Sequence, residues 1–384
     1  MPVRVAATAT ARIAIESAAR RTLKHRLAGW GRAADPTSIA PHPPLSLLAR
    51  PENRRDVTPA PRILRPDPRV SARLHCTGEI EEAIGSVIAP LYRSLGELEH
   101  DPEDDTGDGS GDGCVHLWMF RDRRHIETEH LELHVHGPSV LEAEIRDRIS
   151  RAWKADAPDH ELVWISYRPS DVIFGGPPFQ EDEGFRDGFT RALAIAGRRI
   201  AETFHSASEP LPFGRRQVVL WGLVLTGLQA LALSAEQRSS YLRYHRDWLM
   251  RFPLMQQPDR DERMARLREH FDRRVAAMEG ALESLRSAMG EPPEAGAEPA
   301  VPADADESER RWFQAIRTVH RVVLPLREGW DPRLDPWAER PEHAPLFKLF
   351  HIAANPLGLT LPEEAFTYHL LLRATALEMD SSAP

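Results

Sequence analysis

Three histidines and one glutamate alternate with apolar residues in the segment HLELHVHG, residues 130–137. A period of two is typical of a strand with one buried face. Imidazole can both donate and accept protons near neutral pH, which suits acid–base chemistry. The segment therefore presents candidate acid–base groups on one face of a strand. These polar groups are His130, Glu132, His134 and His136.

Two other interpretations of this segment remain open. Imidazoles two residues apart on one strand face can share a zinc ion, with a third ligand from elsewhere, such as His116 or His125. The polar residues could instead form the solvated side of a sheet. The alternation alone does not separate the three possibilities.

Further groups that could transfer protons lie in the second half of the chain. The segment SYLRYHRDW contains Tyr241, Tyr244 and His245, and the segment FHIAANPLG contains His351 and Asn355. Packing inside a helix is the alternative role for the first three residues. Capping a helix or supporting Asn355 is the alternative role for His351.

Alternating and helical periodicities predict the elements that position these residues. The order of the first six is β-α-β-β-α-β, which is typical of a split ferredoxin-like module with a four-stranded antiparallel sheet and two helices on one face. Trp118 and Arg121 fall on its second strand, next to the third. The predicted strands are 70–76, 114–121, 129–137 and 161–169, and the predicted helices are 79–98 and 138–155.

The rest of the chain, from residue 180, is predicted to be helical. We therefore expect an α+β protein in which a sheet module, residues 70–179, packs against a mainly helical half, residues 180–378. A basic, Pro-rich extension, residues 1–69, and a linker, residues 291–307, are expected to be disordered. The predicted helices are 180–207, 215–234, 236–251, 260–289, 308–328, 343–354 and 362–378.

Composition excludes some classes of function. The net charge of −9 argues against a general nucleic-acid binder, which needs a basic surface. The two cysteines form neither a disulfide framework nor a zinc-finger spacing, which fits the cytoplasm. The apolar segment 218–234 contains Gln229 and is predicted to be a buried helix rather than a membrane span.

Five segments, in this order over residues 70–378, resemble the C-terminal domain of lantibiotic dehydratases, a domain that also occurs alone in thiopeptide biosynthesis. In that family the domain either eliminates glutamate from glutamylated Ser or Thr side chains, or joins two dehydroalanines into a pyridine. The segments are VSARLHC, HLWMFR, EHLELHVHG, YRPSDVIFGG and FHIAANPLGLTLPEEAFTYHLLLRA.

The matched positions distinguish these two activities. Eliminating domains carry HLRLR on the third strand, where this chain has Glu132 and His134 in place of both arginines. They also carry YxPExxRYGG, where this chain has Ser170 and Ile173 at the Glu and Arg positions, and the usual Arg after Asn355 is Pro356. A glutamyl carboxylate needs fixed cations. The resemblance thus favours the pyridine-forming activity.

The resemblance also implies a cleft for the reaction, with no metal and no cofactor. The expected catalytic residues are Glu132, His134, His351, Tyr241 and Tyr244. The expected substrate-binding residues are Trp118, Arg121, His136, Ser170, His245 and Asn355.

The function expected from the resemblance is pyridine synthesis in thiopeptide biosynthesis. Two dehydroalanines join in a formal aza-[4+2] cycloaddition, with loss of water and of the leader peptide. The partner is a leader-bearing, dehydrated, azole-containing precursor peptide, with pathway dehydratases as further partners, and the chain is expected to act as a monomer or homodimer. The alternatives are the glutamate-eliminating subunit of a split dehydratase and a non-catalytic scaffold that binds the leader peptide.

Overall fold

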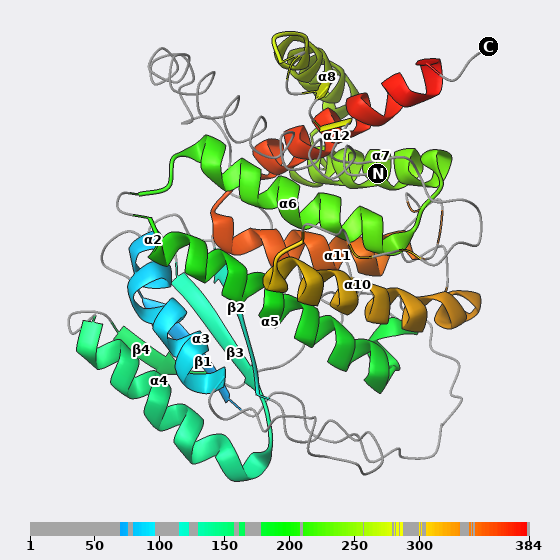
Figure 1. Cartoon of the computed structure of the whole chain (residues 1–384). Coiled ribbons are helices and arrows are strands. Elements are labelled where there is room, and N and C mark those ends of the chain that lie inside the picture. Colours follow the sequence, from blue (N-terminus) through cyan, green and yellow to red (C-terminus); the bar gives the residue numbers. More distant parts are fainter. Residues whose placement is uncertain are drawn as a thin grey trace, which may run out of the picture. The chain divides into compact units, whose positions relative to one another are not determined.

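The computed structural model describes residues 70–75, 80–96, 115–122, 130–156, 161–165, 178–207, 210–255, 257–278, 305–330 and 342–381, with a few single positions between these ranges (Figure 1). The predicted extension 1–69, most of the predicted linker 291–307, and Ser170 lie outside the described residues. The chain forms two compact units. Among the described residues, the sheet unit holds 70–165 and 197–210, and the helical unit holds 178–196 and 211–381.

The sheet unit contains four strands in the spatial order β2-β3-β1-β4, and neighbouring strands are antiparallel. This order is the one that a β-α-β-β-α-β chain produces when each helix crosses over to a strand two places away. The α+β class predicted from the sequence is therefore confirmed. The strands are β1 Val70–His75, β2 His116–Asp122, β3 His130–His136 and β4 Glu161–Trp164.

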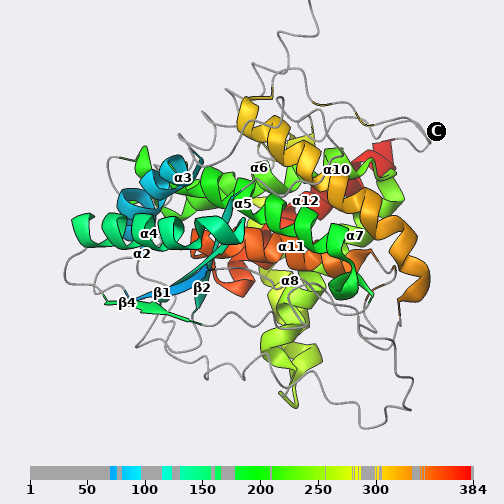
Figure 2. The same ribbon diagram turned by 90° about the horizontal axis from the view of Figure 1, so that it is seen from below.

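Two helical segments cover one face of this sheet (Figure 2). The first consists of α2 Ile80–Ala83, a π-helical turn Ile84–Ile88 and α3 Ala89–Gly96, where the sequence predicted a single helix. The second is α4 Glu142–Asp156. Leu131, Leu133 and Val135 of β3 are buried beneath these helices, because alternate strand residues share a face.

The π turn lies close to the backbone at Phe204. A Cβ atom added at Gly85 would lie 3.1 Å from the backbone carbonyl carbon of Phe204, which is tighter than an ordinary contact, so glycine suits this close approach of two backbones. A π turn also changes the backbone hydrogen-bonding pattern of a helix. The carbonyl oxygen of Gly85 lies 2.8 Å from Nδ1 of His205, which donates to it.

Helix α5 Glu183–His205 contributes residues 183–196 to the helical unit and residues 197–205 to the sheet unit. The other long helices belong to the helical unit. They are α6 Phe213–Leu231, α7 Ala235–Arg251, α8 Arg260–Ala276, α10 Glu307–Leu326, α11 His343–Ala354 and α12 Leu361–Ser381.

Local sequence explains several helix ends. Ser234 and Gln237 form a reciprocal capping box at the start of α7, and Asp306 and Glu309 do the same for α10. Ala232 ends α6 in the left-handed region, at φ 51°. The prediction of a single helix over 260–289 is wrong, because α8 ends at residue 276 and a turn follows at 277–278.

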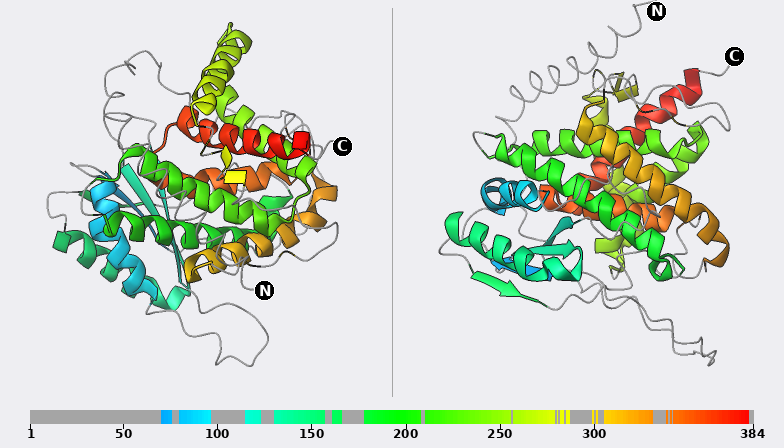
Figure 3. Two further views of the ribbon diagram at one scale, coloured as in Figure 1. Left: turned by 45° about the horizontal axis from the view of Figure 1, so that its top comes forward. Right: turned by 60° about the horizontal axis from the view of Figure 1, so that its bottom comes forward.

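The core of the helical unit is aromatic. Helix α7 packs along α12, and α10 (gold) packs along α6 (green) in Figure 3. Trp312 of α10 is fully buried, and its Nε1 donates to the carbonyl oxygen of Leu223 on α6 at 2.8 Å. Helix α6 contains the segment predicted to be a buried helix. No helix within the described part of the chain is long and apolar enough to span a membrane.

Candidate functional site

The sheet face opposite α3 and α4 carries polar side chains from three strands. In the antiparallel register, Ser71 lies opposite His134 and Arg73 lies opposite Glu132, and Trp118 of β2 lies opposite His134 on the other side. Directly opposed residues of an antiparallel pair share a face. The register therefore gathers the polar residues of HLELHVHG around two residues from β1.

Glu132 is the centre of this group, and its side chain is only 15% exposed. Its Oε1 lies 2.8 Å from Nη2 of Arg73 and 3.3 Å from Nε2 of His130, and its Oε2 lies 3.7 Å from Nε2 of His134. Burial opposes ionisation, but the hydrogen bonds from His130, His134 and Arg73 outweigh it and hold the pKa of Glu132 well below its usual range. Glu132 is thus a permanent carboxylate at neutral pH.

His134 is a neutral imidazole in this arrangement. It is 3% exposed, and burial lowers its pKa, although the neighbouring Glu132 acts in the opposite direction. Its Nδ1 lies 3.1 Å from Oγ of Ser71, and its ring lies 4.2 Å from that of Trp118. Because Nε2 faces a carboxylate, the consistent tautomer places the proton on Nε2, while Nδ1 accepts a hydrogen bond from Ser71.

The charges on this face compensate each other. Arg73 is paired with Glu132, so the pair presents no net positive charge to a substrate. Arg121, which the resemblance places among the substrate-binding residues, lies on the helix-covered face instead, with Nη1 2.7 Å from Oε1 of Glu81. Positions 118 and 121 differ by three, and residues an odd number apart on a strand point to opposite faces.

Three further histidines bear on the zinc interpretation. His136 is half-buried at the end of β3, and it lies opposite His116 of β2 in the register. His125 lies outside the described residues. In the described part of the chain, no group of three His, Cys, Asp or Glu side chains is arranged to hold a metal ion.

Tyr241, Tyr244 and His245 lie on the buried face of α7, inside the helical unit. The ring of His245 lies 4.0 Å from that of Tyr241 and 5.0 Å from that of Phe347. Burial raises the pKa of Tyr241 well above its ordinary value. Burial, together with the charges of His343 and His351, lowers the pKa of His245 well below its ordinary value. The structure thus places these residues in an aromatic core, and their predicted roles in catalysis and substrate binding stay predictions.

His351 is oriented by a carboxylate that the sequence interpretation did not single out. Its Nδ1 lies 2.8 Å from Oε2 of Glu364, which is 3% exposed, while the side chain of His351 is 23% exposed. With a carboxylate as acceptor, Nδ1–H donates. Nε2 then remains for proton exchange with a substrate, as in catalytic dyads in which a carboxylate fixes the tautomer of a histidine.

The chain reverses direction between α11 and α12, and this reversal brings Glu364 to His351 to form a His–Glu dyad. Asn355 ends α11, and its backbone N–H donates to the carbonyl oxygen of His351. Gly358 adopts a φ of 73°, where glycine carries no steric penalty, and α12 then begins at Leu361. Glu364, in the first turn of α12, therefore returns to His351.

The structure brings the predicted residues together in two sets. Glu132, His134 and Trp118 form one set, in the sheet unit. His351, Asn355 and the three residues of α7 belong to the helical unit, where Glu364 joins His351. The shared cleft expected for the two sets stays a prediction. The residues that the sequence interpretation missed are Ser71, Arg73 and Glu364. The polar alternation of VSARLHC was a signal for the first two.

No protein-family model matches the sequence, and no curated protein matches it either. Several solved structures match this chain, among them the following two. The crystal structure of TsrL matches with a TM-score of 0.50 and 16% identity over 81% of this chain and 95% of that one. The tRNA dependent lantibiotic dehydratase MibB from Microbispora sp. 107891 gives a TM-score of 0.39 and 14% identity over 82% of this chain and 28% of that one. This chain therefore has a fold similar to that of TsrL.

Proposed function

We propose that this chain modifies a ribosomally made peptide by building a pyridine ring from two dehydroalanines. One dehydroalanine reacts together with the iminol tautomer of its neighbouring amide, and two carbon–carbon bonds form to the second dehydroalanine. The C–O bond of the former amide then breaks with loss of water, and a C–N bond breaks with release of the leader peptide as a carboxamide. The two eliminations complete the aromatic ring, so the balance needs no oxidant.

The observation that carries this proposal is the charge compensation on the polar sheet face. Arg73 neutralises Glu132, and the adjacent His134 is buried and neutral. Dehydroalanines and azoles are uncharged, so a substrate of this kind needs no fixed cation. Its reaction depends on close approach of the reacting groups and on proton transfer. The resemblance of the sequence segments and the fold similarity to TsrL support the same proposal.

We assign the two proton-dependent steps to two pairs of residues. Glu132 and His134 would stabilise the iminol tautomer of the reacting amide, with the ionised carboxylate of Glu132 accepting a hydrogen bond from the iminol hydroxyl group. At Nε2, His351, oriented by Glu364, would accept a proton from the new ring and donate it to the departing hydroxyl group, which leaves as water, and would then carry out the same transfer as the leader amide leaves. A neutral imidazole can perform both steps in turn.

Glutamate elimination is the second candidate, and the pairing of Arg73 counts against it. A glutamyl carboxylate that approached Arg73 would have to compete with the carboxylate of Glu132, which lies 2.8 Å from it. Each like-charged contact would weaken binding. The third candidate, a scaffold that binds a leader peptide without catalysis, is compatible with the same geometry.

Mass spectrometry of the purified chain with a dehydrated, azole-bearing precursor peptide tests the proposal. We expect a leader carboxamide and a smaller macrocycle. His351→Gln should slow this conversion by about 10² to 10⁴-fold, as expected for loss of a general acid–base group. Glu364→Gln should slow it by about 10 to 100-fold, because the imidazole loses its orienting carboxylate.

Glu363→Gln is the matched control. Glu363 is adjacent to Glu364, but its carboxylate accepts from the backbone N–H of Thr360 at 2.7 Å, and a Gln oxygen can accept the same bond. This variant should convert the peptide at the unaltered rate. If the precursor peptide remained intact after exhaustive incubation, the cyclase proposal would be refuted. Loss of glutamate from a glutamylated peptide would favour the second candidate, and unaltered pathway output with both dyad variants would favour the scaffold.

A further inference from the structure

Helices α7, α8 and α12 line a solvent-open cavity of about 360 Å³ in the helical unit, apart from the residues discussed above. Its lining carries four guanidinium groups and one carboxylate, which leaves an excess of positive charge. The guanidinium groups belong to Arg243, Arg246, Arg268 and Arg373, and the carboxylate belongs to Asp272. A cluster of like charges in a partly enclosed space is unfavourable unless an anion compensates it.

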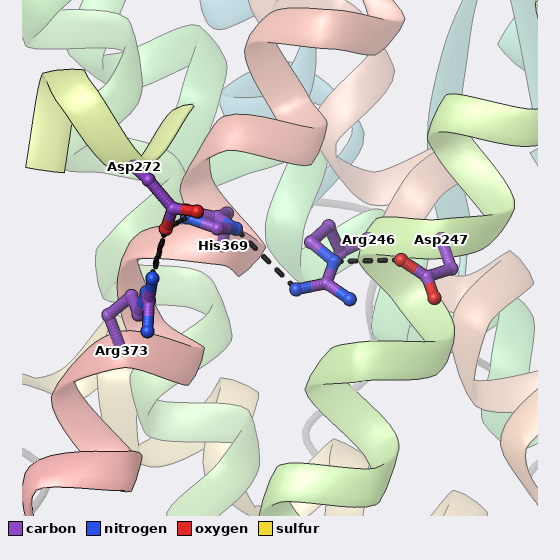
Figure 4. Close-up of polar contacts among 5 residues, drawn as sticks. All are labelled: Arg246, Asp247, Asp272, His369 and Arg373. Carbon is purple, nitrogen blue, oxygen red and sulfur yellow. Dashed lines mark hydrogen bonds and ion pairs between the residues drawn. The ribbon is translucent and has the colours of Figure 1, made fainter. Parts of the chain in front are cut away.

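Two carboxylates of the chain compensate part of this charge (Figure 4). Asp272 accepts from Nε of Arg373 at 2.9 Å, and its Oδ1 lies 3.0 Å from Nε2 of His369. Asp247, at the edge of the cluster, accepts from Arg246 at 2.8 Å and from Arg268 at 3.2 Å. Two carboxylates therefore face four arginines.

Donors are left over after these pairings. Nε of Arg268 is buried, and no hydrogen-bond acceptor for it lies in the described part of the chain. Arg243 is exposed at the cavity and has no acidic partner within the described ranges. Burial, and then the positive charge of Arg246, lower the pKa of His369 to about 4, against the opposing effect of Asp272. The four arginines thus outnumber the carboxylates around the cavity, which leaves it with a net positive charge.

We propose that the cavity between α7, α8 and α12 binds a carboxylate side chain of an acidic peptide segment. The guanidinium groups of Arg243 and Arg268 would hold the carboxylate by charge-assisted hydrogen bonds. Ser239, which also lines the cavity, could donate a third hydrogen bond. The volume suits one or two acidic side chains. The overall net charge of −9 disfavours a polyphosphate chain as the ligand.

Such a segment would be part of the peptide that the proposed function modifies, and to that extent the inference rests on the proposed function. Binding can nevertheless be measured without turnover. A fluorescently labelled tetraglutamate peptide, titrated with the full chain at low salt and followed by anisotropy, should bind at least tenfold more tightly than tetraglutamine. A chain that binds tetraglutamate but converts no precursor would refute the function and leave the site intact.

Substitutions that should change the affinity for tetraglutamate in opposite directions make the test specific. Arg243→Gln and Arg268→Gln should each weaken tetraglutamate binding by about tenfold, because each removes a charge-assisted hydrogen bond. Asp272→Asn should strengthen binding, because it frees Arg373 and removes the competing carboxylate while an amide oxygen can still contact His369. Loss of packing alone would not improve affinity in this variant.

Arg273→Gln is the matched control, because Arg273 is exposed on α8 beside Asp272 and does not line the cavity. This variant should bind tetraglutamate with an affinity within about twofold of that of the unaltered chain. Equal binding of tetraglutamate and tetraglutamine, or an equal loss of affinity in Arg273→Gln, would overturn the proposal. A short RNA oligonucleotide that binds more tightly with the same arginine dependence would overturn the peptide assignment. Full displacement by inorganic phosphate at millimolar concentration would do so as well.

Discussion

Replacing His245 by phenylalanine should remove a defined part of the pH dependence of stability. The imidazole is fully buried among the rings of Tyr241, Phe347 and Tyr368. Its Nδ1 and Nε2 have no hydrogen-bond partner among the described residues. A phenyl ring can keep the ring contacts and does not titrate.

The magnitude follows from the difference in protonation between the folded and unfolded chains. An unfolded histidine titrates at its ordinary pKa of 6.5, whereas burial keeps the pKa of folded His245 well below that value. Stability is therefore fully present above pH 6.5 and is lost as the pH falls, because only the unfolded state takes up the proton. The loss is about 1.4 kcal/mol per pH unit, which gives about 2 kcal/mol between pH 7.5 and pH 5.0.

Urea denaturation at both pH values, followed by far-UV circular dichroism, measures this quantity. The free energy of unfolding should fall by about 2 kcal/mol less in His245→Phe than in the unaltered chain. Tyr241→Phe is the matched control, because it changes the same cluster but removes a phenol whose pKa burial has raised further above this pH range. Its pH dependence should equal that of the unaltered chain.

The reasoning would be refuted if His245→Phe kept the full pH dependence, since the folded imidazole would then be accessible to protons. The same variant bears on function. If His245 only fills the core, His245→Phe retains the activity of the chain. If it contacts substrate, activity falls while stability is maintained.

Two further predictions concern the sheet face and the helical core. In a double-mutant cycle, Arg73→Met and Glu132→Gln should show a coupling of about 1–2 kcal/mol in the free energy of unfolding at pH 7, because either single change leaves one charge without its partner; additive effects would contradict the pairing. Gly227→Ala should destabilise the chain by about 1–3 kcal/mol, because the new methyl group would overlap the buried ring of Phe350. Gly96→Ala, whose nearest neighbour is a flexible Arg198 side chain 4.0 Å away, is its control, and an equal loss in both variants would contradict the steric explanation.

Periodicity predicts the sheet unit well, because each strand has one face that must be buried. Leu131, Leu133 and Val135 specify both the strand and its orientation. The close approach of Gly85, in the π turn, to Phe204 could not be predicted, since the two residues are more than a hundred positions apart in the sequence. The turn after α8 was missed for a different reason. The helical periodicity of the sequence continues beyond residue 276, where α8 ends.

The residues of the candidate site were predictable only in part. The spacing of Tyr241, Tyr244 and His245 places them on one helix face, but spacing cannot tell whether that face borders a cleft or a core. Arg73 contacts a residue 59 positions away in the sequence, whereas Glu364 is 13 positions from His351 but on the next helix. Strand register joins Arg73 to Glu132, and the left-handed turn at Gly358 joins Glu364 to His351. The first contact depends on the pairing of two strands, and the second depends on the geometry of the turn between two helices.

The paired state of Glu132 changes the meaning of the sequence differences. Compared with HLRLR, the segment HLELHVHG does not simply lack two cations, since the register adds Arg73 opposite Glu132. The guanidinium group is present but is occupied by a carboxylate of the chain itself. A glutamyl substrate would need to displace that carboxylate, whose pKa shows how strongly its charged form is held. An uncharged dehydrated peptide would meet no such competition, which is the reason for proposing cycloaddition rather than glutamate elimination.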